Sequence, residues 1–521
     1  MVQTELQVED RADALLGKLG FTAWRPGQRE AVEAALEGRD SLIVMPTGGG
    51  KSLCYQLPGL ATEDLTIVVS PLIALMNDQW RRLSAAGHPV AMVTSAMSEE
   101  AVRHALAQVR GGAARIVYCS PERFASGVFL EAIGQRRIDL LAVDEAHCVS
   151  EWGHDFRPDY LRLPEIAERL GRPTVMACTA TATEAVAREI AARFQMREPL
   201  QVRSGFDRPS LSFDVVRLEG KGSKARRTAL LEAGLADPAN RPAIVYCGTR
   251  RDTDEVAATL REAGLRALGY HAGMEAEDRA GTQARFMAGE VDVIVATNAF
   301  GMGVDKADVR SVWHMAIPTS LEAYYQEAGR AGRDGQPARA VLLAMKADLG
   351  RLVRFNQQRA GNPDLAIAHE RGWRDYQTIK SFIYSERCRR RSVLDHFGDS
   401  QAGAPLERCC DVCDPQDWLP DPETIAIRRP AKAKQPAAPP PELSPADASL
   451  FEQLKEWRLR AADGKPAFTI AHNSTLQAIA ATRPTTEDAL LAIKGIGPSF
   501  VTKYASEVLA LVASDLESGS E

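Results

Sequence analysis

The stretch Met45-Pro-Thr-Gly-Gly-Gly-Lys51-Ser52 follows a short apolar run and precedes a segment with helical periodicity. Consecutive glycines let backbone N–H groups converge on phosphate oxygens, and a helix N-terminus favours negative charge. Lys51 would then reach the β- and γ-phosphates, and Ser52 would hold Mg²⁺. The strict phosphate-loop pattern has glycine in place of Met45, so the stretch alone also fits an ordinary glycine-rich turn. The nucleotide contacts predicted in this loop are Thr47, Gly48, Gly49, Gly50, Lys51 and Ser52.

An acidic motif further along the chain supports the same site. Leu140-Leu-Ala-Val-Asp144-Glu145-Ala-His147 is an apolar run that ends in two carboxylates. Asp144 suits the coordination shell of Mg²⁺, and Glu145 suits the polarisation of an attacking water. Either motif alone could arise by chance. Their occurrence in order, each after a predicted strand, favours a nucleotide site.

The surrounding pattern predicts an α/β fold. Short apolar runs alternate with longer helical patterns over residues 1–345, which is typical of parallel sheets covered by helices. Polar or glycine-rich clusters follow nearly every run, where open α/β sheets bind ligands. Two sets of five strands predict two α/β domains that meet near 203–209. The expected strands are Ser41–Met45, Leu65–Val69, Arg115–Cys119, Leu140–Asp144, Thr174–Cys178, Ala243–Cys247, Arg266–Tyr270, Val291–Ala296, Ser311–Ala316 and Ala340–Ala344.

Composition sets wider limits. A chain of 521 residues exceeds one core and divides into several domains. Its sequence has no apolar run near the ~18–20 residues that span a membrane, so we expect a cytoplasmic protein. The net charge of −6 is weak evidence against a nucleic-acid partner, because binding depends on local basic patches.

The second half divides into smaller parts. Beyond residue 345 the chain is helical and basic up to a cysteine cluster, and residues 420–448 then hold eight prolines and seven alanines. Such a stretch is typical of a semi-extended linker. Leu450, Leu454 and Trp457 restore a helical period after it. We predict an α/β domain over 1–205, a second over 206–345, a helical metal-binding module over 346–418, a linker over 419–448 and a small all-α domain over 449–515.

These motifs resemble those of the RecQ helicases of superfamily 2. The phosphate loop and the Asp144 motif resemble the first two helicase motifs, and Trp24-Arg25-Pro-Gly-Gln28 resembles the adenine-reading element of RecQ enzymes. Gln28 would pair with N6 and N7 of adenine. Phe21 lies where the family stacks an aromatic ring on the base. Core packing is the alternative for both aromatics and the one we favour for Trp24.

The resemblance continues in order from about residue 15 to about residue 415. Thr179-Ala-Thr181 resembles the third motif, and Gln326-Glu-Ala-Gly-Arg330-Ala-Gly-Arg333 resembles the last. It implies two tandem RecA-like lobes, with Arg333 as an arginine finger that stabilises charge in phosphoryl transfer and Arg330 as its neighbour. The implied catalytic residues are Lys51, Asp144, Glu145, Gln326, Arg330 and Arg333, and the implied base contacts are Phe21, Arg25 and Gln28.

The stretch directly after the acidic motif resembles the aromatic-rich loop characteristic of RecQ helicases. Aromatic side chains with an interleaved arginine offer flat faces for unstacked bases and a cation for phosphate. A packed surface loop is the alternative. The implied DNA contacts are Trp152, His154, Phe156 and Arg157.

The cysteine cluster resembles the RecQ zinc module. Cys410-Asp-Val-Cys413 has the spacing of a structural zinc knuckle. Glu407 stands where the family has a further cysteine, and side chains of adjacent residues diverge in extended backbone, so Cys409 needs a turn to join the site. Glu407 and His396 are the alternative fourth ligands. The predicted zinc ligands are Cys388, Cys409, Cys410 and Cys413.

Residues 449–515 resemble an HRDC domain. The glycine turn at Ile493-Lys494-Gly495 precedes a helix that carries Lys503, and such a turn can hold a DNA phosphate. A turn that only packs helices fits equally well. The short stretch between Cys413 and this domain leaves no room for the winged-helix domain that commonly follows the zinc module in the family.

Together the resemblance implies an ATP-hydrolysing DNA helicase that uses Mg²⁺ and Zn²⁺ and moves 3′→5′ on single-stranded DNA. Repair and recombination are the implied processes, with single-stranded or tailed duplex DNA and repair proteins such as single-strand binding protein as partners, in the cytoplasm near the nucleoid. An RNA helicase and a DNA-binding scaffold with a weak motor are the alternatives. The aromatic loop and the zinc cluster disfavour the first, and the complete catalytic set disfavours the second.

Overall fold

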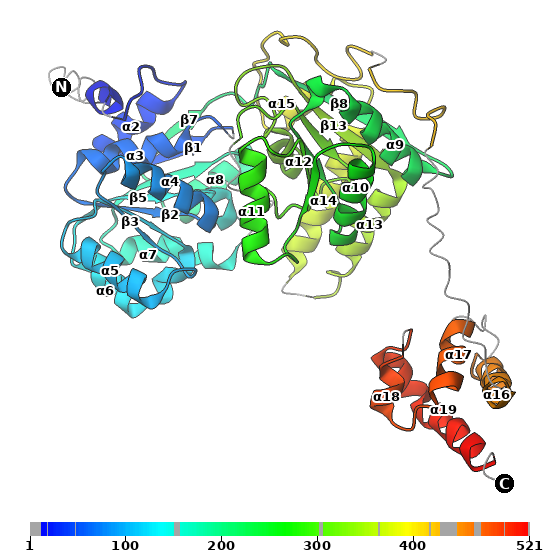
Figure 1. Ribbon diagram of the computed structural model, residues 1–521. Coiled ribbons are helices and arrows are strands. Elements are labelled where there is room, and N and C mark those ends of the chain that lie inside the picture. The colour runs from blue at the N-terminus through cyan, green and yellow to red at the C-terminus, as the bar shows by residue number, and fades with distance from the viewer. Residues whose placement is uncertain are drawn as a thin grey trace. The chain divides into compact units, whose positions relative to one another are not determined.

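The computed structural model contains two compact units, Met1–Arg428 and Arg429–Glu521 (Figure 1). It describes residues 12–17, 19–46, 48–150, 157–301, 306–362, 365–415, 418–427, 445–462, 470–493 and 495–518. Within these ranges, no helix is both long enough and apolar enough to cross a membrane.

The first sheet of the larger unit has seven parallel strands in the order β3-β4-β2-β5-β6-β1-β7. Its inner strands β1 and β2 are buried along their whole length, as helices on both faces of a parallel sheet require. The strands are β1 (Ser41–Val44), β2 (Leu65–Val69), β3 (Val90–Val93), β4 (Ile116–Cys119), β5 (Ile138–Val143), β6 (Thr174–Thr179) and β7 (Leu200–Arg203), and the helices are α2 (Gln28–Leu36), α3 (Lys51–Ala61), α4 (Ile73–Ala85), α5 (Glu99–Arg110), α6 (Gly127–Gly134), α7 (Leu163–Arg169) and α8 (Glu184–Arg193).

The second sheet has six parallel strands in the order β10-β11-β9-β12-β13-β8. The confirmed fold class is therefore two parallel α/β lobes in tandem. The strands are β8 (Leu211–Leu218), β9 (Ala243–Tyr246), β10 (Ala267–Tyr270), β11 (Val293–Ala296), β12 (Ser311–His314) and β13 (Ala338–Met345), and the helices are α9 (Ser223–Ala236), α10 (Arg250–Glu262), α11 (Ala276–Met287) and α12 (Leu321–Ala328).

The sequence predicted two sets of five strands, whereas the two sheets have seven and six strands. The sequence reading missed β3, β7 and β8, and each of these lies at the edge of its sheet. An edge strand has one neighbour, so it needs less apolar sequence than a central strand. β7 exposes the polar residues Gln201 and Arg203, and β8 carries the polar residues Ser212 and Asp214, whereas β3 is a short apolar strand that is buried along its whole length.

A helical module packs against the second sheet and continues further than the sequence indicated. It consists of α13 (Lys346–Gln357), α14 (Ala366–Tyr384) and α15 (Arg389–His396). Leu419 and Ile425 pack into the core beside the second sheet, and the guanidinium of Arg339 lies 4.3 Å from the ring centre of Trp418. These partly buried side chains extend the packed part of the chain past residue 419, where the linker was predicted to begin.

The smaller unit is helical, as predicted. Its helices are α16 (Pro445–Ala461), α17 (Asn473–Thr482), α18 (Glu487–Leu491) and α19 (Pro498–Ser518). Leu450, Leu454 and Trp457 lie in its core. Arg483 connects α16 to α19 through ion pairs with Asp447 at 3.2 Å and Asp515 at 2.7 Å.

Candidate nucleotide site and metal cluster

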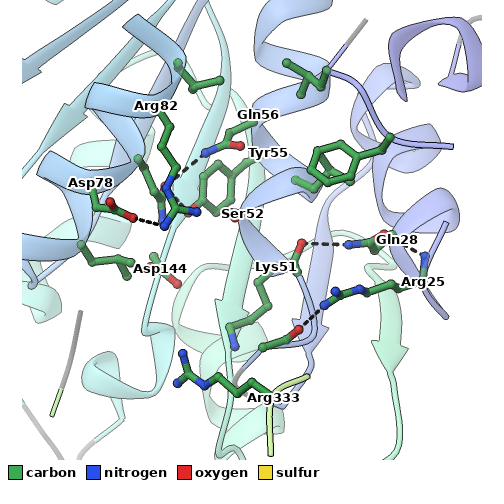
Figure 2. A pocket seen from close by; sticks show the side chains of 18 of the residues that line it. Arg25, Gln28, Lys51, Ser52, Tyr55, Gln56, Asp78, Arg82, Asp144 and Arg333 are labelled. Atoms are coloured by element: carbon green, nitrogen blue, oxygen red, sulfur yellow. Dashed lines mark hydrogen bonds and ion pairs between the residues drawn. The ribbon is translucent and has the colours of Figure 1, made fainter. Parts of the chain in front are cut away.

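A cavity of about 660 Å³ brings together residues from both sheets of the larger unit. The loop after β1 and the end of β5 line it from the first lobe, and the end of α12 with the loop that follows lines it from the second. Figure 2 shows Arg333 beside Lys51 and the phosphate loop. The predicted site residues that line the cavity are Phe21, Arg25, Gln28, Gly48, Gly50, Lys51, Ser52, Asp144, Glu145, Gln326, Arg330 and Arg333. Thr47 lies outside the described residues.

The phosphate loop has the backbone that its glycines permit. Gly48 and Gly50 both have φ of +84°, a region that favours glycine. A β-carbon at Gly50 would lie 2.3 Å from Nε2 of Gln28, so a side chain there would displace the Gln28 amide. Helix α3 begins at Lys51, whose ammonium donates to the carbonyl oxygens of Met45 (3.0 Å) and Pro46 (3.3 Å). The site thus combines glycine backbone, a helix N-terminus and a lysine, which together suit a polyphosphate.

Gln28 contacts the phosphate loop directly. Its side chain is 3% exposed, and Nε2 donates to the carbonyl of Gly50 at 3.0 Å while Oε1 accepts from the N–H of Arg25 at 2.9 Å. The guanidinium of Arg25 donates to the carbonyl of Gly48 (Figure 2). Gln28 would therefore have to release these partners before it could pair with adenine. The structure adds a contact to the loop that the sequence reading did not anticipate.

The two aromatic residues near this element differ in their surroundings. Phe21 is 51% exposed and lines the cavity, so core packing does not account for it. Trp24 packs beside a small apolar cluster, and its indole N–H donates to Asp13 at 2.6 Å. This agrees with the packing role favoured for Trp24.

Two neighbouring carboxylates are buried at the end of β5. Asp144 and Glu145 are 4% and 9% exposed. Burial, and then the charge of Glu145, raise the pKa of Asp144 to about 7, although Lys51 opposes the shift. Glu145 has φ of +49°, a left-handed conformation that is strained for a residue with a side chain. Among the described residues, Oε2 of Glu145 accepts no hydrogen bond, although it lies 3.4 Å from Nδ1 of His147. A strained backbone and a buried carboxylate oxygen without a hydrogen bond are typical of a site built for a ligand.

A histidine connects this acidic motif to the third motif. Nδ1 of His147 lies 2.9 Å from the hydroxyl of Thr179, which also accepts from the N–H of Thr181 at 3.3 Å. The hydroxyl of Tyr160 donates to the carbonyl of Asp144 at 3.0 Å. The sequence motifs predicted no role for His147 or Tyr160.

Side chains of α3 and α4 extend the cavity, and the sequence reading missed them as well. The hydroxyl of Tyr55 donates to Gln79 at 3.0 Å, and Arg82 forms an ion pair with Asp78 at 2.9 Å (Figure 2). Polar residues at 78, 79 and 82 share one face of α4, which is the signal that could have identified them.

The two arginines after α12 reach the first lobe. Arg330 is 5% exposed, and its positive charge opposes the rise that burial causes in the pKa of Tyr246. A β-carbon placed on Gly48 would lie 3.8 Å from Cγ of Arg333. The second lobe therefore presents a guanidinium next to the phosphate loop of the first.

The four cysteines of the predicted metal site form a cluster. Their sulfur atoms all lie within 4.8 Å of one another. A turn brings Cys409 inward: its N–H donates to Oδ2 of Asp414 at 2.8 Å, and the N–H of Asp414 donates to the carbonyl of Cys410 at 3.0 Å. Of the alternative ligands, Glu407 is exposed, and Nε2 of His396 lies 2.7 Å from a carboxylate oxygen of Glu322. Four thiols at this spacing fit Zn²⁺.

Most of the predicted DNA contacts lie outside the described residues, namely Trp152, His154, Phe156 and Lys494. The N–H of Arg157 donates to the carbonyl of Cys148 at 3.1 Å, so the two ends of the aromatic loop are joined. Lys503 is exposed on α19.

Comparison with known proteins identifies the family. The chain matches the family models of the DEAD/DEAH box helicase (residues 25–190), the helicase conserved C-terminal domain (225–335), the RecQ zinc-binding domain (346–414) and the HRDC domain (447–512). It is 38% identical to the ATP-dependent DNA helicase RecQ of Pasteurella multocida over 401 residues. The chain belongs to the RecQ helicase family. The matched part covers 77% of this RecQ-family chain and 62% of that relative. For RecQ of Bacillus subtilis the identity is 37%, with 76% and 66% covered.

Solved structures support the fold of the two lobes. The DEAD-box helicase Mss116 bound to ssRNA and UDP-BeF has a TM-score of 0.55 at 18% identity, with 67% of this chain and 75% of that chain covered. The DUF1998 helicase MrfA bound to DNA has a TM-score of 0.55 at 20% identity, with 71% and 56% covered. One of these proteins holds RNA and the other DNA, so the fold of the RecQ-family chain does not by itself select the nucleic acid.

Proposed function

We propose that this chain is an ATP-hydrolysing, Mg²⁺-dependent DNA helicase that moves 3′→5′ on single-stranded DNA and unwinds duplexes in repair and recombination. One observation carries the proposal. A single cavity combines a phosphate loop and two buried carboxylates from one lobe with arginines from the other. Membership of the RecQ family supports DNA as the track and 3′→5′ as the direction. Cytoplasmic work near the nucleoid, with partners such as single-strand binding protein, follows from that activity.

The residues at the loop and at β5 fit a Mg²⁺–nucleotide complex. The hydroxyl of Ser52 and the carboxylate of Asp144 are oxygen ligands of the kind that Mg²⁺ prefers. Two adjacent buried carboxylates are also costly without a cation. When bound, Mg²⁺ would neutralise part of the phosphate charge. Lys51 would exchange its contacts with backbone carbonyls for the β- and γ-phosphates.

The residues proposed for hydrolysis come from both lobes. Oε2 of Glu145, which accepts no hydrogen bond among the described residues, would accept one from the attacking water and orient it toward the γ-phosphate. Arg333, with Arg330 and Gln326 beside it, would stabilise the negative charge that develops during transfer. Because these groups come from different lobes, bound ATP favours a closed pair and its loss allows the pair to open. That cycle would advance the strand.

The contacts around the acidic motif offer a route by which DNA could affect this chemistry. The predicted DNA-binding loop of Trp152, Phe156 and Arg157 begins a few residues after Glu145. His147 connects the same segment to Thr179. We assign the cysteine cluster to a structural Zn²⁺ that stabilises the helical module.

The test is ATP hydrolysis measured without nucleic acid and with single-stranded DNA, duplex DNA or RNA. We expect the largest stimulation by single-stranded DNA, and strand displacement on a duplex with a 3′ tail but not a 5′ tail. Stronger stimulation by RNA would instead support an RNA helicase. Binding of DNA without hydrolysis under any condition would support a scaffold with a weak motor.

A further inference from the structure

The segment that joins β7 to β8, residues 204–210, carries a cation that contacts the arginine loop of the second lobe. Nη1 of Arg208 donates to the carbonyl of Gly329 at 3.1 Å, and Nη2 donates to the carbonyls of Ala331 at 2.8 Å and Gly332 at 3.1 Å. No ion pair with Arg208 is present among the described residues, so its charge is directed at peptide oxygens. These three carbonyls belong to the loop that holds both predicted catalytic arginines.

An arginine is well suited to this place. Helix α12 ends at Ala328, and the carbonyls at a helix C-terminus lack intrahelical donors and favour a nearby positive charge. The last turn of α12 has no basic residue of its own, so Arg208 provides that charge from the connecting segment. Burial lowers the pKa of Arg208, which agrees with its shielding from water. A lysine has no planar fork that could reach three carbonyls together.

The same loop has little freedom elsewhere. Gly332 has φ of +61°, and its N–H donates to the carbonyl of Val309 at 2.9 Å. A β-carbon at Gly332 would lie 2.9 Å from the carbonyl oxygen of Gln336. Arg333 follows directly and lies beside the phosphate loop. The peptide planes of residues 329–332 therefore determine where the guanidinium of Arg333 is placed.

The connecting segment is itself held by the helical module. The ring of Phe206 stacks on Phe397 with 4.3 Å between centroids and 3° between planes. Nε of Arg390 donates to Asp207 at 2.6 Å. The hydroxyl of Tyr325 in α12 donates to the carbonyl of Phe206 at 2.7 Å. Arg208 thus extends from a fixed support.

We propose that Arg208 is a positioning residue that holds the loop of Arg330 and Arg333 in the geometry required for phosphoryl transfer. The proposal rests on the proposed function, because it assumes that Arg333 stabilises the transition state. Arg208 does not line the cavity, so it acts through the loop.

The test compares Arg208→Lys with a matched control, Arg172→Lys. Arg172 also donates to backbone carbonyls, those of Phe194 and Gln195, but it does not line the cavity. The measurement is the affinity of the full chain for Mg²⁺–ADP with and without aluminium fluoride, which mimics the transferring phosphoryl group. We expect Arg208→Lys to weaken the fluoride complex by about tenfold and ADP by less than about twofold, since only the former needs the arginine loop. Arg172→Lys should change neither.

A second variant covers the case in which Arg208→Lys does not fold. Tyr325→Phe removes one hydroxyl that holds the same segment and should produce the same selective loss at about threefold. Equal weakening of ADP and of the fluoride complex, or no selective loss in either variant, would overturn the positioning role.

The double variant with Arg333→Ala separates this inference from the proposed function. If Arg208 acts through Arg333, the double variant binds the fluoride complex no worse than Arg333→Ala alone. A further tenfold loss that persists when Arg330 is also replaced by alanine would reject the inference and leave the proposed function intact. Wild-type fluoride binding by Arg333→Ala itself would instead reject the finger role on which both rest.

Discussion

The nucleotide cavity and the cysteine cluster are built in opposite ways. The cavity takes residues from Leu19 to Arg333, drawn from two lobes. The cluster takes four cysteines from the short range 388–413 and holds their sulfurs within 4.8 Å of one another. The cavity contains a strained Glu145 and a buried oxygen without a hydrogen-bond partner, whereas the cluster is a closed set of like ligands.

This difference predicts that the cavity serves catalysis and that the cysteine cluster serves stability. A site that spans two lobes can change its shape with the ligand, although Gln28 and Lys51 also hold the phosphate loop through hydrogen bonds. A compact four-thiol site can do little but hold its module together. Substitutions in the cavity should therefore affect catalysis and spare the fold, and substitutions in the cluster should do the reverse.

The largest expected effect is on the cluster. We predict one zinc per chain, and we predict that Cys409→Ser loses the metal and unfolds the helical module, because a structural zinc can contribute on the order of 10 kcal/mol to folding. Metal analysis and thermal unfolding provide the measurement. Glu407→Gln is the matched control and should keep its zinc, since Glu407 is exposed. Loss of metal in the control alone would identify Glu407 as the ligand.

The second largest effect is expected from substitutions in the nucleotide cavity. Lys51→Ala or Glu145→Gln should lower ATP turnover by about a thousandfold or more, because each removes a charge placed for the transition state. The thermal midpoint should stay near that of the unchanged chain, and Glu145→Gln should be the more stable, since it removes one of two adjacent buried charges. Phosphate release and calorimetry check both quantities. Near-normal turnover would remove the catalytic assignment.

A buried carboxylate in the helical module provides a smaller test. Burial, and then the charge of Glu322, raise the pKa of Asp375 to about 7. The native chain thus keeps a proton that the unfolded chain releases near pH 4, so the free energy of unfolding should fall as the pH rises from about 4 to about 7. Asp375→Asn should add roughly 2 kcal/mol at pH 8 and almost nothing at pH 4. Urea unfolding at both pH values measures this. An equal effect at the two would mean that Asp375 titrates normally.

The smallest effect concerns the C-terminal unit. Residues 445–515 hold eight acidic and seven basic residues, and Arg483 is already ion-paired. Deleting residues 429–521 should weaken DNA binding by about threefold at low salt and by less at high salt, where phosphate contacts are screened, through a lower effective DNA concentration near the motor. Turnover at saturating DNA should be unchanged. Binding isotherms across a salt series test this, and a collapse of saturated turnover would show that the unit regulates the motor.

Local patterns were sufficient for much of this molecule. The glycines before Lys51, the acidic end of β5 and the cysteine spacing are each contained in a few consecutive residues, and they predicted the fold class and the family correctly. The central strands were predicted for the same reason, because burial on both faces imposes a continuous apolar run. The edge strands β7 and β8 were missed because polar residues interrupt their apolar pattern, whereas β3 was missed although its four residues are apolar and buried.

Other features depend on residues that meet only after folding. Three examples are the turn that brings Cys409 to the other thiols, the contacts of Gln28 with the phosphate loop, and the hydrogen bonds from Arg208 to the arginine loop. No repeating sequence pattern relates the residues that meet in these contacts. The sequence by itself determined which chemistry this chain carries, because phosphate and metal sites need particular residues at short, fixed spacings. Only the tertiary structure decided how that chemistry is held in place, because the supporting contacts come from the packing of two sheets and a helical module against one another.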